Sequence, residues 1–133
     1  MPLKTKRWDE PREPDDGVRL LITRFRPRGV SKAAETWDAW EPNLGPTPEL
    51  LKAFKDGGGG SPAAWATYRR HYLAQMKGQA PRIAELAARI RAGESVTLLC
   101  SSSCLRESRC HRSLLRELIE ARVAAASELP PSP

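Results

Sequence analysis

The sequence predicts an α/β fold, a small and mostly parallel sheet of three to five strands flanked by helices. Two short apolar runs, 18–23 (VRLLIT) and 95–100 (SVTLLC), have the composition of buried strands in a parallel sheet. Long segments with helical periodicity separate them. The chain of 133 residues suits one core. We therefore expect a single domain over residues 1–127 and a disordered tail over 128–133, which contains three prolines.

The first forty residues supply the remaining strand and a connecting loop. Residues 3–8 alternate in polarity, as an edge strand does. Residues 9–17 are rich in proline and acidic residues and end in the turn signal Asp15-Asp16-Gly17. We expect this loop to connect two strands without contributing to the core.

The predicted helices begin at recognisable capping residues. A serine or threonine precedes each of the first three, and proline often occupies the first helical position. The starts are Ser31 before KAAETWDAW, Thr47-Pro48 before ELLKAF, Ser61-Pro62 before AAWATYRRHYLAQM, Pro81 for the fourth helix and Cys110 for the last. Gly93 is placed to end the fourth helix.

Composition limits the class of protein. The formal charge is +6, and 16 of the 22 basic residues are arginine, which suits a phosphate or carboxylate partner. A genome whose base composition favours arginine codons would give the same number of arginines without any ligand. No apolar run approaches the roughly eighteen residues of a membrane span, and residues 4–13 are too charged for a signal peptide. We expect a cytoplasmic protein that does not enter membranes.

Polar segments follow both core strands. The first contains Arg24, Arg26 and Arg28 on alternate positions, and the second runs from Cys100 to Arg112. Ligands of parallel sheets bind at the carboxyl ends of strands. We therefore predict that the two segments meet at one edge of the sheet and bind a small anionic ligand, with the three arginines and Arg112 contacting its oxygens.

The second segment also carries reactive side chains. Cys110 falls at the start of a helix, where the helix field and neighbouring basic residues favour thiolate over thiol. We expect Cys110 to act as nucleophile or redox thiol and His111 to move a proton. Cys100 and Cys104 are further candidates for contact with the ligand, although Cys100 at the end of an apolar strand also suits the core.

Other functions remain open at this point. A thiol redox sensor requires two of the three cysteines within disulfide reach. A module that binds nucleic acid or an acidic partner would use the net charge alone, but no helix-turn-helix or zinc-finger pattern supports it. A phosphatase-like loop from Cys100 to Arg106 lacks the usual glycine. We expect no metal, because adjacent Cys110 and His111 would have difficulty reaching one tetrahedral ion. The sequence identifies no cofactor and no oligomeric state.

Several ordered motifs resemble the domain of unknown function 488 family. They are Thr5-Lys6-Arg7, Asp16-Gly17 followed by VRLLITRFRPRGVSK, ELLKAFK, and LLC followed by CHRSLLRELIE. The resemblance spans about residues 3–121. It implies a compact Rossmann-like α/β sandwich and a site that includes Arg24, Arg28, Cys110, His111 and Arg112, without naming a reaction. The chain departs from the family pattern at Arg26, where tryptophan is common, and in the run 101–103.

Overall fold

The computed structural model describes residues 3–57, 61–101 and 110–128. Within them a parallel sheet has the strand order β1-β4-β2-β3. The strands are β1 (Leu3–Arg7), β2 (Val18–Leu21), β3 (Ala39–Trp40) and β4 (Val96–Cys100). The predicted α/β fold is confirmed, and β1 lies at an edge as its alternation indicated. Leu21 pairs with Leu99, so β2 and β4 end side by side at the carboxyl edge of the sheet.

The helices follow the predicted starts closely. They are α1 (Pro48–Asp56), α2 (Pro62–Met76), α3 (Ala80–Arg91) and α4 (His111–Glu128). The Thr47 side chain accepts a hydrogen bond from the Leu50 amide, and Ser61 accepts one from the Ala64 amide. These bonds satisfy amides that the first turn leaves open. Gly93 takes φ +96° after α3, a backbone conformation that favours glycine and ends the helix.

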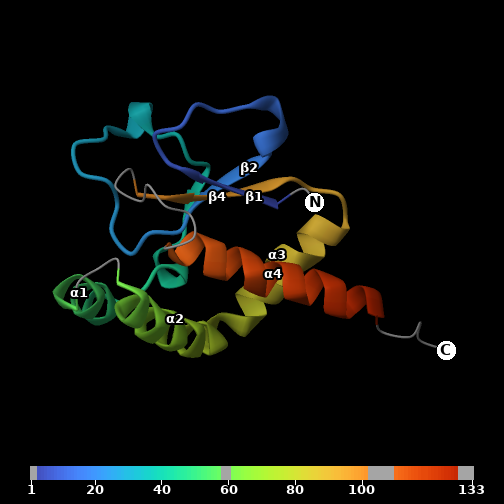
Figure 1. The fold of residues 1–133 in the computed structure, drawn as a ribbon. Coiled ribbons are helices and arrows are strands. Elements are labelled where there is room, and N and C mark those ends of the chain that lie inside the picture. Colours follow the sequence, from blue (N-terminus) through green and yellow to red (C-terminus); the bar gives the residue numbers. More distant parts are fainter. Residues whose placement is uncertain (1–2, 58–60, 102–109, 129–133) are drawn as a thin grey trace.

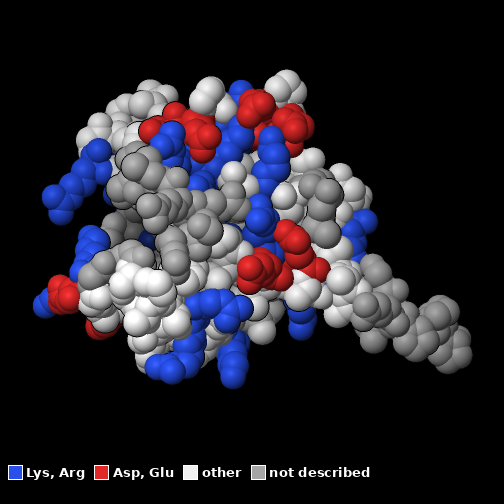
Figure 2. Space-filling view, viewed as in Figure 1, with Lys and Arg blue, Asp and Glu red and all other residues white. Residues whose placement is uncertain are grey.

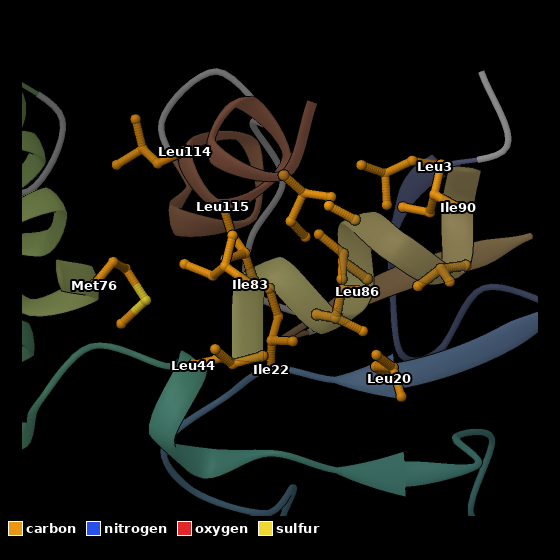
Figure 3. Packing of buried hydrophobic residues seen from close by; sticks show 14 of the residues in the cluster. Leu3, Leu20, Ile22, Leu44, Met76, Ile83, Leu86, Ile90, Leu114 and Leu115 are labelled. Atoms are coloured by element: carbon orange, nitrogen blue, oxygen red, sulfur yellow. The ribbon is translucent and has the colours of Figure 1, made fainter. Parts of the chain in front are cut away.

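The two faces of the sheet are covered differently. Figure 1 shows the helices on one side, with α3 and α4 lying against the strands and α1 and α2 beyond them. Leu20 and Leu98 on that face join the main core, to which Ile83, Leu86 and Leu115 contribute from the helices (Figure 3). The opposite face is covered by connecting segments, where Trp37 packs with Leu21 and Leu99. Side chains alternate between the faces along each strand.

The helix predicted over residues 32–40 is wrong. A single 3-10 turn spans Lys32–Ala34, residues 35–38 form no helix or strand, and β3 begins at Ala39. Tertiary contacts outweigh the weak helical preference of this segment. The Asp38 carboxylate accepts a hydrogen bond from the Arg19 amide, the Thr36 hydroxyl donates to the Trp8 carbonyl, and Trp37 is buried.

The loop over residues 9–17 contributes more than the sequence suggested. Asp16 is completely buried, and its carboxylate forms ion pairs with Lys4 at 2.6 Å, Lys6 at 2.9 Å and Arg19 at 3.0 Å. As expected, no residue of this loop belongs to either hydrophobic cluster of the described residues, but the loop also delivers the counter-charge for three basic residues of β1 and β2. At the surface, Figure 2 shows acidic and basic side chains lying next to one another over the upper part of the molecule.

No helix among the residues that the structure describes is long and apolar enough to cross a bilayer. The predicted tail lies almost entirely outside them, and α4 reaches Glu128.

Candidate functional site

A cluster of two thiols and an imidazole lies where β4 ends and α4 begins. The sulfurs of Cys100 and Cys110 are 3.1 Å apart, and each lies 3.9 Å from Nδ1 of His111. All three side chains are buried, with exposed fractions of 1, 2 and 5%. The structure therefore brings together residues that are ten positions apart in the sequence, and we call these three side chains the Cys-Cys-His centre.

Local structure explains why the three side chains meet. Cys100 is the last residue of β4, two positions after Leu98, so both side chains point to the helix-covered face. Cys110 directly precedes α4, and its carbonyl accepts hydrogen bonds from the Ser113 amide at 3.1 Å and hydroxyl at 2.8 Å. This geometry places the Cys110 sulfur at the amino end of an 18-residue helix, where the backbone amides favour negative charge.

The orientation of His111 is set by the end of β2. Its Nε2 lies 2.7 Å from the carbonyl oxygen of Ile22. A carbonyl only accepts hydrogen bonds, so Nε2 carries a proton and donates it. In the neutral ring Nδ1 then holds a lone pair, which faces both sulfurs. The arrangement can accept a thiol proton or bind a metal ion.

Tyr72 forms one wall of the Cys-Cys-His centre. Its ring centroid is 5.6 Å from that of His111, and its hydroxyl donates to the Leu44 carbonyl at 2.7 Å. Burial raises the pKa of Tyr72 well above its usual range, and negative charge on Cys110 and Cys100 raises it further. The phenol therefore stays neutral. No signal in the sequence indicated the contact of Tyr72 with His111.

The arginine-rich segment meets the centre through its backbone. Ile22, which orients His111, lies two residues before Arg24. The Arg24 guanidinium donates to the carbonyls of Pro46 and Gly45, each at 3.1 Å, and so clamps the segment before α1. The end of the strand run 18–23 therefore contacts His111 through Ile22, while a shared site of the arginine side chains and the Cys-Cys-His centre stays a prediction.

The other two arginines differ from each other. Arg26 pairs with Glu35 at 2.8 Å and lies over the Trp37 ring, on the face of the sheet opposite the helices. Arg28 is exposed and makes no hydrogen bond or ion pair with any described residue. The Arg26 guanidinium is thus engaged by Glu35, whereas Arg28 keeps its guanidinium at the surface.

The structure describes only some of the remaining predicted site residues. Arg112 is buried in the first turn of α4. Cys104 and Arg106 lie outside the described residues. A contact of Cys104 with a ligand therefore stays a prediction, and the phosphatase-like loop that the sequence disfavoured is not tested. The other histidine of the chain, His71, was not a predicted site residue and is exposed on α2.

The argument against a metal site does not hold for this geometry. Sequence adjacency was expected to keep Cys110 and His111 from sharing an ion, yet their ligand atoms are 3.9 Å apart. One atom from each of Cys100, Cys110 and His111 lies within 4.8 Å of the others. Two sulfurs and a ring nitrogen are the ligand types that zinc prefers.

Comparison with known proteins places the chain in a family. The family model DUF488-N3a, described as "Active DUF488-N3 subclade", matches residues 3–123. This chain belongs to the DUF488 family. It is also similar to "Uncharacterized protein YeaO" of Escherichia coli (strain K12), with 34% identity over 105 residues that cover 77% of this chain and 84% of YeaO. No solved structure matches the chain. The resemblance inferred from sequence motifs is therefore confirmed.

Proposed function

We propose that this DUF488 protein is a thiol redox protein in which Cys100 and Cys110 interconvert between a dithiol and a disulfide. The observation that carries the proposal is the geometry of the centre. The sulfurs need to approach by only about 1 Å to reach the roughly 2.05 Å of a disulfide. This satisfies the requirement of the sensor hypothesis, namely two cysteines within reach of each other.

His111 gives the pair its proton chemistry. Because Nε2 donates to Ile22, the Nδ1 lone pair faces the sulfurs and can accept a thiol proton. Cys110, at the amino end of α4, is the sulfur better placed to hold negative charge. We assign Cys110 as the attacking thiolate and Cys100 as the resolving thiol.

A hydroperoxide is the oxidant class that suits a buried pair, because it is small. The Cys110 thiol transfers its proton to His111, and the thiolate attacks one peroxide oxygen. The O–O bond breaks, Cys110 becomes a sulfenic acid, and the departing hydroxide takes the proton back from His111 to form water. Cys100 then attacks the sulfenic sulfur, and the second oxygen leaves as water with the Cys100 proton. Two thiols and one hydrogen peroxide thus become one disulfide and two waters.

The proposal is tested by mass spectrometry of the reduced, metal-free protein after treatment with one equivalent of hydrogen peroxide. We expect a loss of two hydrogens and, after blocking of thiols and proteolysis, a bridge between the peptides of Cys100 and Cys110. Quantitative recovery of both cysteines as blocked thiols, or a bridge that contains Cys104, would contradict the assignment.

Two variants separate proton transfer from structural loss. His111→Ala should slow bridge formation by about 10²-fold or more, the usual contribution of a positioned base. Its matched control is His71→Ala, which removes the other histidine, exposed on α2, and should oxidise at the wild-type rate. The circular dichroism of each variant establishes that it is folded. Equal rates for the two variants would remove His111 from the mechanism.

Binding of a small anion is a second candidate function, favoured by the Arg24 contacts. The partners described for the Arg24 guanidinium are backbone and amide oxygens, which leave its positive charge uncompensated beside the segment that orients His111. With Arg28 and Arg112 it would attract phosphate-like groups. Calorimetry with inorganic phosphate tests this, and Arg28→Ala should weaken binding about tenfold with little change in stability. An identical affinity would exclude Arg28 from the site.

A further inference from the structure

We infer that Cys100, Cys110 and His111 also form a binding site for one thiophilic metal ion, with Zn²⁺ as the ion whose preferences they match best. The inference uses the residues of the proposed redox pair but rests on ligand type and geometry, so it does not depend on thiol oxidation. It concerns the reduced state, in which both sulfurs are available as ligands.

The distances suit a shared ion after a small adjustment. Bond lengths of about 2.3 Å for zinc to sulfur and about 2.05 Å for zinc to nitrogen imply tetrahedral separations of about 3.8 Å between sulfurs and about 3.6 Å between sulfur and nitrogen. The observed values are 3.1 Å and, for both sulfur–nitrogen pairs, 3.9 Å. The sulfurs would move apart by about 0.7 Å and the imidazole inward by about 0.3 Å.

The surroundings of His111 match those of a metal ligand. A ligating histidine usually donates its second ring N–H to a carbonyl or carboxylate, which fixes the tautomer and the direction of the lone pair. Here Nε2 donates to the Ile22 carbonyl at 2.7 Å, and the neighbouring Tyr72 ring packs against the imidazole. The ligand is therefore oriented before any ion arrives, which lowers the entropic cost of binding.

The described residues supply three of the four ligands of a tetrahedral zinc ion, namely two cysteines and one histidine. Metal binding also requires both thiols to lose their protons. The same two sulfurs cannot bind an ion while bridged, so binding of the ion and formation of the disulfide exclude each other.

The test is titration of the fully reduced, chelator-treated full chain with Co²⁺ and then Zn²⁺ under anaerobic conditions. We expect one equivalent of Co²⁺ to produce a near-ultraviolet charge-transfer band of cobalt–thiolate bonds and the intense visible bands of tetrahedral coordination. One equivalent of Zn²⁺ should abolish both sets of bands. Absence of cobalt–thiolate absorption in the folded wild-type protein would overturn the inference without bearing on the redox proposal, because peroxide oxidation is measured on metal-free protein.

Variants identify the ligands. His111→Ala should weaken Zn²⁺ binding by at least about 100-fold. Loss of a residue that only contacts a metal ligand costs up to about 100-fold, so loss of a ligand itself should cost at least as much. The matched control His71→Ala should bind as the wild type does, since it removes an exposed histidine on α2. Calorimetry in buffers of different ionisation enthalpy supplies a readout beyond folding, because binding should release protons. Unchanged affinity in His111→Ala, or no proton release, would contradict the proposed ligand set.

Discussion

Two buried polar clusters lie on opposite faces of the sheet, and their chemistry differs. On the loop-covered face, the Asp16 carboxylate is surrounded by Lys4, Lys6 and Arg19. On the helix-covered face, the Cys-Cys-His centre places two thiols around one ring nitrogen. The first cluster is an assembly of opposite charges and serves the fold. The second contains groups that can exchange protons, electrons or a metal ion, which is why we assign function to it.

The largest effect is expected from breaking the charged cluster. Asp16→Asn leaves three buried or half-buried cations around a neutral amide, so the free energy of unfolding should fall by about 3–5 kcal/mol. Urea denaturation followed by circular dichroism measures it. The matched control is Asp15→Asn, because that side chain is 75% exposed and contacts Lys4 at the surface. Its loss should lower the free energy of unfolding far less than Asp16→Asn does, because an exposed ion pair contributes little.

A smaller effect is expected from acid. Burial alone would raise the pKa of Asp16, but the ammonium groups of Lys4 and Lys6 and the Glu13 amide outweigh it and hold the pKa well below its usual range. The unfolded chain therefore binds a proton more readily than the folded one below about pH 4, and stability falls as the pH falls.

Denaturation curves between about pH 6 and pH 2 check this. The free energy of unfolding should be constant near pH 6 and decline once the pH approaches the ordinary aspartate value of about 3.9. In Asp16→Asn the decline should be shallower. Parallel curves for the two proteins would show that other carboxylates control the acid response.

The sequence predicted most of the fold because local signals agreed with tertiary packing. The apolar runs ending at Ile22 and Cys100, and the caps Thr47 and Ser61, each specify an element without help from distant residues. The segment 32–40 failed because its partners are distant. Hydrogen bonds between Asp38 and the backbone of Arg19 decide its conformation, and no local pattern contains them.

The sequence predicted only part of the site, again because local patterns do not contain its long-range contacts. Strand order in a parallel sheet brings Ile22 and Cys100 to one edge, so the proximity of the two strand ends could be foreseen. The direction in which each side chain points could not be foreseen. Arg26 turns to Glu35 and Trp37, while the His111 ring turns to a backbone carbonyl that carries no sequence information.

The central claim is that the Ile22 carbonyl holds His111 with its Nδ1 lone pair facing both sulfurs. Long-range ¹H–¹⁵N NMR of the reduced, metal-free protein tests it directly, and His71→Ala assigns the signals, because the chain has 2 histidines. The account predicts that His111 is the neutral tautomer protonated at Nε2. A tautomer protonated at Nδ1 would place a proton where the base and metal ligand must be, and would contradict both proposals.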